Sequence, residues 1–235
     1  MGINNNSEST DDIDLSCFPF FKSLTKEECD ILNFEKKCIA SQRGTIIYEE
    51  GCRLSGFYFI TRGIVKIYKT GIDGKEQIIK FANKGDIFGY RSLLSEETAC
   101  STSKVIEDAI LYHIPYKILL NLVEANPLFS LDILRIACDE LKEANECITY
   151  FGLKTVRERL AEVLLLLHKN FKLDTDQRIQ ISLTREELAN TVGTATEVII
   201  RFLSEFKREK LIDLKGRKIK ILNLNELKKV AKLTD

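Results

Sequence analysis

Three side chains near position 200 are of the types that read the edges of DNA bases: Thr196, Glu197 and Arg201. An arginine donates two hydrogen bonds to guanine, a glutamate accepts one from the amino group of cytosine, and a threonine contacts thymine or phosphate. Glu197 and Arg201 are four residues apart, which is also the spacing of an ordinary salt bridge on a helix surface. We expect both roles together, with the glutamate orienting the arginine.

The elements that must hold these side chains are predicted in residues 184–203, which have the spacing of two short helices. Thr184 followed by Glu187 is a capping-box pattern, and it marks the start of a helix. We expect this helix to end near Thr191, because Gly193 permits the positive φ that a sharp turn requires. Two helices joined by a turn of this kind are typical of a helix-turn-helix.

Thr194 and Glu197 repeat the capping-box pattern, which predicts that the second helix starts directly after the turn. In a helix-turn-helix, the first residues of the second helix enter the major groove. Further on, residues 211–214 and 218–222 predict a β-hairpin whose tip carries Lys215 and Arg217. We expect this hairpin to be the wing of a winged helix and its basic tip to contact phosphate rather than bases.

The charge of the chain is divided unevenly between its two ends. Over 235 residues the net charge is zero, but residues 1–150 carry 17 basic and 23 acidic side chains, whereas residues 151–235 carry 18 and 12. The half that contains the predicted helix-turn-helix is therefore the basic half. This division fits an acidic sensor attached to a DNA-binding domain.

Composition excludes several other classes of protein. The apolar content of 44% is enough for a hydrophobic core, and no apolar run is long enough to span a membrane. Because the first residues are polar and acidic rather than signal-like, we expect a cytoplasmic protein. The seven cysteines are scattered, without a CxxC pair, so no disulfide framework is expected. No nucleophile with a base, metal-ligand spacing or phosphate loop is present, so we do not expect an enzyme.

Before the basic half, the sequence predicts a glycine-rich β domain. An apolar segment at residues 17–21 precedes a helix capped by Thr25 and Glu28. Between residues 39 and 114, short β-rich runs at 45–48, 57–61, 64–68 and 77–81 are separated by glycines. Eight of the twelve glycines fall there, and Asp73-Gly74 is a typical hairpin turn. This density of turns predicts a compact antiparallel barrel or sandwich.

A long helix is predicted from residue 128 to about 151, after a shorter one that follows Pro115 and a start signal at Asn126-Pro127. Its apolar positions recur at spacings of three and four, which is the pattern of a coiled-coil seam. We expect this seam to pair two chains, since a dimer places two recognition helices on successive major grooves. The alternative is burial within one chain. The seam residues are Leu131, Leu134, Cys138, Leu141, Asn145 and Ile148.

The order of these elements resembles the bacterial Crp/Fnr transcription regulators, named for the cyclic-AMP receptor protein and the fumarate and nitrate reduction regulator. The resemblance covers residues 18–223 and includes FFKSLTKEE at 20–28, FYFITRG at 57–63, DGKE at 73–76, GDIFG at 85–89 and residues 184–201. It implies an α+β fold: an antiparallel β-roll like a cyclic-nucleotide-binding domain, a long dimerisation helix and a C-terminal winged helix-turn-helix. The corresponding domains are a polar leader at 1–16, the β-roll at 17–127, the dimerisation helix at 128–151 and the winged helix at 152–235.

The resemblance also implies roles for individual residues in DNA binding. Thr184 and Arg185 match positions that contact phosphate, and Glu197 with Arg201 matches the base-reading pair of the family. Thr196 replaces an arginine of the cyclic-AMP branch, so we expect a different target site. The implied partners are double-stranded DNA, RNA polymerase and a second copy of the chain. The alternative is a ligand-binding regulatory module that acts through protein partners without specific DNA binding.

The effector site of the cyclic-AMP branch is altered in this sequence. That branch holds the ribose with a glutamate and the phosphate with an Arg-Ser pair, where this chain has Tyr90, Cys100 and Ser101. The base-contacting Thr-Ser pair of the long helix is likewise Ala144-Asn145. We therefore do not expect cyclic AMP to bind in the usual mode. Arg91 and Ser92, next to Gly89, are candidates to hold an anion from a shifted position, although Arg91 also fits a solvated loop charge.

Other cofactors are not expected either. An iron-sulfur cluster needs four suitably placed thiolates, and Cys17 stands alone where the oxygen-sensing branch clusters three. The two histidines, His113 and His168, fit structural or surface positions better than a haem ligand. Cys17 and Cys100 remain candidates for redox-sensing thiols, although the sequence places no evident basic neighbour beside them. The expected effector is thus an unknown small molecule, if one exists.

Overall fold

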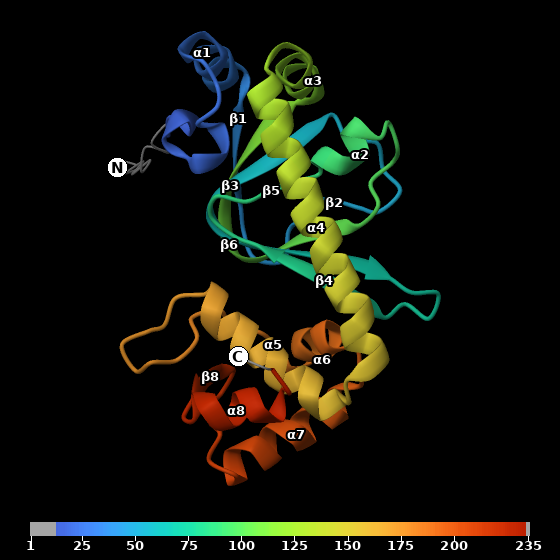
Figure 1. Cartoon of the computed structure of the whole chain (residues 1–235), viewed down its shortest axis with the longest axis vertical. Coiled ribbons are helices and arrows are strands. Elements are labelled where there is room, and N and C mark those ends of the chain that lie inside the picture. The colour runs from blue at the N-terminus through green and yellow to red at the C-terminus, as the bar shows by residue number, and fades with distance from the viewer. Residues whose placement is uncertain (1–12, 234–235) are drawn as a thin grey trace, which may run out of the picture. The chain divides into compact units, whose positions relative to one another are not determined.

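The computed structural model describes residues 13–233, and by their internal packing they fall into two compact units (Figure 1). The first unit holds the residues up to 65 together with 82–137, and the second holds 66–81 and the chain from 138 onwards. Residues 1–12 of the predicted leader lie outside the described part. Leu15 is fully buried, so the folded domain begins slightly before residue 17, where the sequence placed its boundary.

The sheet is antiparallel where its pairing is defined, as the glycine-separated runs predicted. Strands β1 and β2 pair antiparallel with β6, β5 pairs antiparallel with β3, and the order across the sheet is β1-β6-β3-β4. The end of β3 and most of β4 are counted with the second unit. The strands are β1 (Lys37–Ser41), β2 (Ile46–Tyr48), β3 (Gly56–Thr70), β4 (Glu76–Ala82), β5 (Ile87–Phe88) and β6 (Thr102–Pro115).

One strand replaces two that the sequence predicted. The runs at 57–61 and 64–68 are continuous in β3, so Gly63 does not end a strand. Gly63 has a φ of 87°, and a Cβ atom there would lie 2.4 Å from the carbonyl oxygen of Asp108. The glycine is therefore needed for close approach to β6 rather than for a turn. The Asp73-Gly74 turn between β3 and β4 is confirmed, with the Gly71 N–H donating to Lys75 O at 2.8 Å.

The core of the first unit is aromatic at its N-terminal end. Phe59 on β3 meets the rings of Phe18 and Phe21 at centroid distances of 4.6 and 5.1 Å. The following helix starts with the predicted capping box, in which Thr25 and Glu28 bond to each other's backbone N–H. The helices and turns of this unit are η1 (Leu15–Cys17), η2 (Pro19–Phe21), α1 (Lys26–Glu35), α2 (Tyr90–Leu94) and α3 (Tyr116–Ala125).

The predicted long helix is α4 (Pro127–Leu153), which at 27 residues is about 40 Å long. The side chain of Asn126 accepts hydrogen bonds from the backbone N–H groups of Leu128 and Phe129, each at 3.1 Å, and so starts the helix as predicted. Phe129 and Ile133 are buried on one side of it. Among residues 13–233 no helix combines the length and apolar composition needed to cross a membrane.

The second unit contains the predicted helix-turn-helix and wing. Its first helix after α4 begins with a capping box formed by Thr155 and Glu158. A helix that the sequence analysis did not predict, α8, starts where the Asn223 side chain accepts from the Glu226 N–H at 3.1 Å. The elements are α5 (Val156–Asn170), α6 (Arg185–Val192), α7 (Thr196–Arg208), β7 (Ile212–Lys215), β8 (Lys218–Ile221) and α8 (Leu224–Val230).

Candidate nucleic-acid interface

The first helix of the motif, α6, begins as the sequence predicted. The Thr184 hydroxyl accepts from the Glu187 N–H at 3.0 Å, and the Glu187 carboxylate accepts from the Thr184 N–H at 2.7 Å. The helix buries Leu188, Ala189 and Val192. It then ends at Gly193, whose φ of 70° is left-handed and therefore favours glycine.

The second predicted capping box, from Thr194 to Glu197, is wrong. Helix α7 starts at Thr196, and its N-cap is Ala195, which has no side chain able to cap. The Thr194 N–H instead donates to the carbonyl of Ala189 at 3.1 Å and closes the turn. Because the turn uses Thr194, its hydroxyl lies one residue too early to cap the helix.

Helix α7 has one buried face and one exposed face. Ile199, Leu203 and Phe206 are buried, and they pack α7 into its own unit. The exposed positions Glu197, Ile200, Arg201 and Ser204 recur at helical spacing, so they lie on a single outward face. Ile200 was not among the predicted site residues, yet 49% of it is exposed. Ile200 could have been predicted from the sequence, because it follows Glu197 by three residues and therefore lies on the same face of a helix.

The partner of Arg201 differs from the predicted one. The ion pair at Arg201 is with Glu205, one turn further along α7, at 4.0 Å from Nε. The guanidinium also lies over the ring of Phe202, 5.0 Å from its centroid. The contacts of the Arg201 guanidinium are therefore with residues that follow it in α7. Glu197, in the first turn of the helix, is exposed.

The wing forms as predicted, with β7 paired antiparallel to β8 and both Lys215 and Arg217 exposed at its tip. Arg185, at the start of α6, donates from Nη2 to the carbonyl of Gly216 in that tip at 2.8 Å. Its other terminal nitrogen, Nη1, is buried and makes no hydrogen bond within the described residues. Burial also holds the pKa of this guanidinium below its usual range. Arg185 thus joins the helix-turn-helix to the wing.

Comparison with known proteins matches both parts of the chain. A model of the cyclic nucleotide-binding domain matches residues 39–126, and one of the Crp-like helix-turn-helix domain matches residues 158–230. The fumarate and nitrate reduction regulatory protein of Vibrio cholerae is 31% identical over 92% of this chain and 86% of its own length. The chain belongs to the Crp/Fnr family of transcription regulators.

A second relative and a solved structure are also similar to this Crp/Fnr regulator. The fumarate and nitrate reduction regulatory protein of Escherichia coli K12 is 28% identical over 92% of this chain and 86% of its own. A crp/fnr-family transcriptional regulator from Eubacterium rectale has the same fold, with a TM-score of 0.76, 20% identity and coverage of 92% of this chain and 99% of its own. The prediction of a DNA-binding regulator rather than an enzyme is confirmed, because the family consists of transcription regulators that bind DNA and act as dimers.

The winged helix of this Crp/Fnr regulator is fastened to the end of α4 by Arg159. The Arg159 guanidinium lies 4.9 Å from the ring centroid of Phe151 and donates from Nη2 to the carbonyl of Gly193 at 3.3 Å. The Tyr150 hydroxyl in turn donates to the carbonyl of Arg159 at 3.0 Å. One cation therefore contacts both the last turns of α4 and the turn between α6 and α7.

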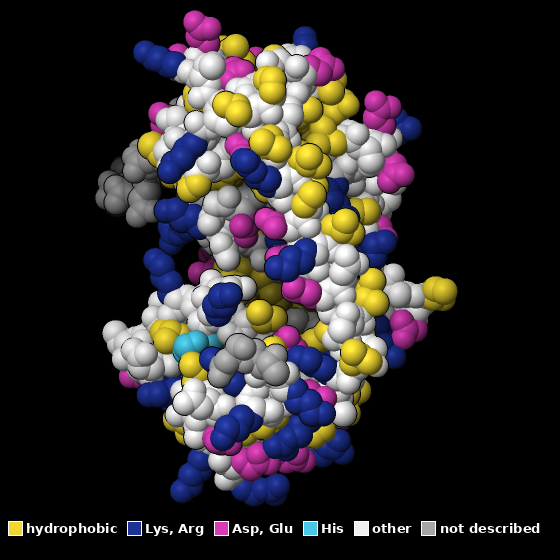
Figure 2. Space-filling model, viewed as in Figure 1, with side chains coloured by type: hydrophobic (Ala, Val, Ile, Leu, Met, Phe, Trp, Pro, Cys, Tyr) yellow, Lys and Arg dark blue, Asp and Glu magenta, His cyan; other side chains and the backbone are white. Residues whose placement is uncertain are grey.

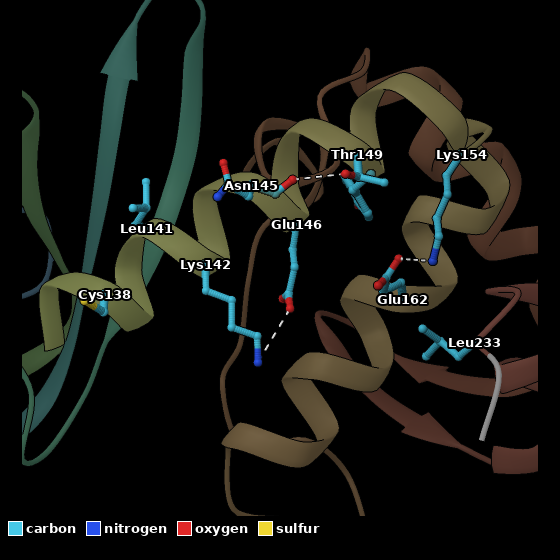
Figure 3. Close-up of a pocket in the computed structure, with 10 residues that line it drawn as sticks. Cys138, Leu141, Lys142, Asn145, Glu146, Thr149, Lys154, Glu162 and Leu233 are labelled. Carbon is cyan, nitrogen blue, oxygen red and sulfur yellow. Dashed lines mark hydrogen bonds and ion pairs between the residues drawn. The ribbon is translucent and has the colours of Figure 1, made fainter. Parts of the chain in front are cut away.

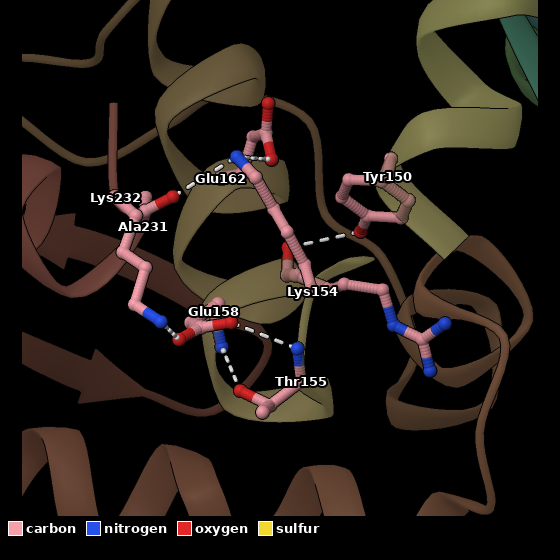
Figure 4. A network of polar contacts seen from close by, with 8 residues as sticks. Tyr150, Lys154, Thr155, Glu158, Glu162, Ala231 and Lys232 are labelled. Atoms are coloured by element: carbon pink, nitrogen blue, oxygen red, sulfur yellow. Dashed lines mark hydrogen bonds and ion pairs between the residues drawn. The ribbon is translucent and has the colours of Figure 1, made fainter. Parts of the chain in front are cut away.

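A second set of polar contacts holds the start of α5 to the C-terminal segment (Figure 4). Lys154 forms an ion pair with Glu162 at 2.7 Å and donates to the carbonyl of Ala231 at 3.0 Å. Lys232 pairs with Glu158 at 2.7 Å, and this contact together with the capping hydrogen bonds lowers the pKa of Glu158 to about 2. These contacts make α8 and the residues after it part of the DNA-binding unit.

The predicted effector residues of the regulator cluster at β5, α2 and the start of β6. Gly89 caps α2, and Arg91 donates from Nη2 to the sulfur of Cys100 at 3.0 Å. Burial raises the pKa of this thiol, but the hydrogen bond and charge of Arg91, with smaller contributions from Ser92 and Ser101, outweigh it and lower the pKa overall. The basic neighbour that the sequence analysis did not find for Cys100 is therefore Arg91, nine residues earlier.

Tyr90 packs in the core. It is 2% exposed and packs in the hydrophobic core of the first unit, where the cyclic-AMP branch would place a glutamate toward the ligand. Ser92 and Ser101 are also buried, and the Ser92 hydroxyl accepts from the Cys100 N–H at 3.3 Å. Of the six predicted residues, Arg91, Ser92 and Ser101 thus each interact with Cys100, while Tyr90 packs in the core.

Proposed function

We propose that the regulator is a homodimer that binds a near-palindromic operator. Two α7 helices would enter successive major grooves about 34 Å apart. The observation that supports this is the exposed face of α7, which carries Glu197 and Arg201 beside a basic wing. A bacterial regulator that binds DNA must be in the compartment that contains the DNA, so we propose that it is cytoplasmic. We also propose RNA polymerase as a further partner.

The side chains of α7 and those around it have separate roles in this proposal. Arg201 donates to guanine, Glu197 accepts from cytosine and Ile200 contacts the methyl group of thymine. Thr196, at the start of α7, contacts thymine or phosphate. The remaining contacts go to phosphates and set the register of the protein on the duplex. They come from Thr184, Arg185, Thr194, Lys215 and Arg217.

The test is selection of binding sites from random duplex DNA, followed by titration of the best site at several salt concentrations. The selected sequence should have two-fold symmetry, and log K should fall linearly with log salt as phosphates are neutralised. Selection that returns no common sequence would contradict the proposal, and so would an affinity that does not depend on salt. Immunoprecipitation of bound genomic DNA with sequencing would then identify the regulated genes.

We further propose that the first unit does not bind cyclic AMP in the usual mode. The support is geometric: Tyr90 packs in the core, and the guanidinium of Arg91 is directed at a thiol of the same chain, the Cys100 sulfur. A different anionic effector would have to reach Arg91 and Ser92. Calorimetry with a panel of nucleotides tests this: a binding heat that Arg91→Ala removes supports the anion site, and binding that Arg91→Ala leaves unchanged refutes it.

The Arg91–Cys100 contact also predicts a pH dependence. A thiol whose pKa is lowered becomes a thiolate at a lower pH. Alkylation of Cys100 by iodoacetamide should therefore reach half its maximal rate at a lower pH than alkylation of an ordinary cysteine does. Arg91→Ala should move this midpoint to higher pH, because it removes the donor and the charge. Peptide mass spectrometry follows Cys100 separately from the other cysteines. An unchanged midpoint in the variant would show that Arg91 does not stabilise the thiolate.

We propose, finally, that the regulator holds no iron-sulfur cluster. All seven cysteines lie within residues 13–233, and there no three His, Cys, Asp or Glu side chains are close enough together to hold a metal ion. Four thiolates within reach of one another are the usual requirement for such a cluster. Anaerobic reconstitution with iron and sulfide tests this, since a cluster would give a visible absorption band that the proposal excludes.

A further inference from the structure

The face of α4 opposite its buried side carries the predicted seam, and the chain itself does not cover it. Leu134, Leu141 and Ile148 are 57%, 62% and 71% exposed, and Leu131, Cys138 and Asn145 are exposed as well. Figure 2 shows hydrophobic side chains recurring along this helix among charged ones. Burial within one chain, the alternative considered from the sequence, therefore does not hold for these residues.

The spacing of the six residues assigns them heptad positions. Steps of three and four residues place Leu131, Cys138 and Asn145 at a, with Leu134, Leu141 and Ile148 at d. In a parallel pair of helices in register, each a residue faces the same residue of the partner. In an antiparallel pair, a residues face d residues. The two orientations therefore give different neighbours to Cys138 and Asn145.

Asn145 favours the parallel orientation. Two asparagines that face each other at a can exchange hydrogen bonds between their amides, and a single asparagine of this kind sets register in coiled coils. Opposite a leucine, the same amide would be buried without a partner. The Asn145 carbonyl already accepts from the Thr149 hydroxyl at 3.1 Å, but its side-chain amide is exposed on the seam.

The charges beside the seam favour the same orientation. Arg135 and Lys142 occupy the e positions, and Ala137 and Ala144 occupy the g positions. A parallel pair places each cation beside a partner alanine, whereas an antiparallel pair places the cations of the two chains beside one another. The cations have carboxylates on their own helix, Asp132 at 2.8 Å and Glu146 at 3.9 Å, so they need none from the partner.

The surface beside the seam leaves room for a second helix. Cys138, Leu141 and Asn145 line an open groove of about 750 Å³, together with Thr149 and Leu233 (Figure 3). Packed helices have axes about 8–10 Å apart, and Cα atoms lie about 2.3 Å from each axis. Facing a residues then have Cα atoms about 3.4–5.4 Å apart, which overlaps the range of about 4.4–6.8 Å that a disulfide spans.

We propose that Cys138 forms a disulfide with the partner's Cys138 when a peroxide is present, in a homodimer whose α4 helices pair in parallel and in register along this seam. The proposal rests on the homodimer of the proposed function and adds an oxidant-dependent covalent lock to it. Disulfides are rare and usually transient inside cells, which fits a lock that closes only under oxidation.

The chemistry balances with hydrogen peroxide as the oxidant. One Cys138 thiolate attacks a peroxide oxygen, so that an S–O bond forms, the O–O bond breaks and hydroxide leaves. The partner's thiolate then attacks the sulfenic sulfur, so that the S–S bond forms, the S–O bond breaks and a second hydroxide leaves. The two protons that the thiols gave up convert the two hydroxides to water. Two thiols and one peroxide thus give one disulfide and two waters, and the oxidant takes up the two electrons.

Cys147 provides a matched control on the same helix. It is exposed like Cys138, but it lies nine residues further on, which is about half a turn away from the seam. The full-length protein and its Cys138→Ser and Cys147→Ser variants are reduced, treated with hydrogen peroxide and run on non-reducing gels. Light scattering of each reduced sample gives the oligomeric state independently of any covalent bond.

The wild type and Cys147→Ser should form a covalent dimer that reductant dissolves, and Cys138→Ser should lose it while staying dimeric in solution. Covalent dimer in Cys138→Ser, or none in a wild type that light scattering shows to be dimeric, would overturn the disulfide and leave the homodimer intact. A monomer in light scattering would instead overturn the homodimer on which the proposal rests.

A second variant tests the register directly. In a Cys138→Ser background, Asn145→Cys places a thiol at the next a position, which faces its own copy only in a parallel pair. Oxidation should restore the covalent dimer. A dimer that cannot be cross-linked at this position would contradict the parallel, in-register arrangement.

Discussion

The exposed faces of α7 and α4 differ in the kind of partner they suit, although α7 and the first turns of α4 each bury another face. On α7 the outward positions are mostly polar, with Glu197, Arg201 and Ser204 beside a single exposed isoleucine. On the seam of α4 they are mostly leucine and isoleucine, with one cysteine and one asparagine. A polar face keeps its hydrogen-bonding groups for base edges and phosphates, whereas an apolar face gains most from a second apolar surface. The two interactions should therefore respond differently to charge, salt and mutation.

The largest effect is expected from a charge on the apolar face. Leu141→Glu would bury two unpaired carboxylates in the seam of a dimer, at a cost of several kcal/mol, or at least about 100-fold in dimerisation. Light scattering should show a monomer, and operator binding should fall with it. Phe34→Glu, at a phenylalanine on α1 that is even more exposed than Leu141, should remain dimeric. A dimeric Leu141→Glu variant would remove α4 as the partner surface.

The next effect belongs to the polar face. Arg201→Ala should weaken binding to the selected operator by about 10- to 100-fold, the range of one bidentate base contact, and leave the dimer unchanged. Binding to random DNA should change little. Arg208→Ala removes the same charge from the exposed last turn of α7 and serves as the control. Equal losses on operator and random DNA in Arg201→Ala would show that Arg201 contacts phosphate only.

A smaller and non-selective effect is expected from the wing. Replacing Lys215 and Arg217 by alanine should weaken binding to all DNA sequences alike, and removing each cation that neutralises a phosphate should reduce the salt slope by about one. Titrations at several salt concentrations measure both quantities. If the double variant no longer discriminated between bases while keeping its salt slope, the wing would be reading sequence instead of binding phosphate.

The smallest effect should come from the isoleucine on the polar face. Ile200→Ala removes apolar surface that would cover a thymine methyl, worth about 1 kcal/mol or roughly fivefold in affinity. Competition between operators that differ only by thymine or uracil at one position would locate the contact. Wild-type protein that binds both operators equally at every position would exclude Ile200 from base reading.

Local sequence patterns correctly predicted the features that depend on hydrogen bonds between residues close together in the sequence. The Thr184 capping box, the turn at Gly193, the wing and the start of α4 all form where the sequence placed them, because cap and turn chemistry acts within four residues. The helix at Asn223 carried the same kind of signal in Glu226, and the sequence analysis passed over it. The capping box predicted at Thr194 does not form, because Thr194 is part of the turn that joins α6 to α7 and Ala195 is the N-cap of α7.

Features that depend on distant parts of the chain could not be predicted in this way. Gly63 was taken for a turn because nothing near it in sequence shows that Asp108 approaches its backbone. The Arg91–Cys100 contact joins a helix to a strand, and the sequence shows neither group's direction. The ion pair of Arg201 with Glu205 has helical spacing, as the predicted pair with Glu197 also has, so spacing alone did not distinguish them.

The sequence alone determined the family, the order of elements and the types of side chain at the two outward faces, because periodicity and short motifs are local properties of the chain. The tertiary structure decided which of those faces stays exposed. Burial depends on what packs against a helix from elsewhere: Phe129 and Ile133 are buried on one side of the first turns of α4, and Ile199 and Leu203 are buried on one side of α7. The seam and the base-reading face are the sides left over, and they are therefore the sides available to partners.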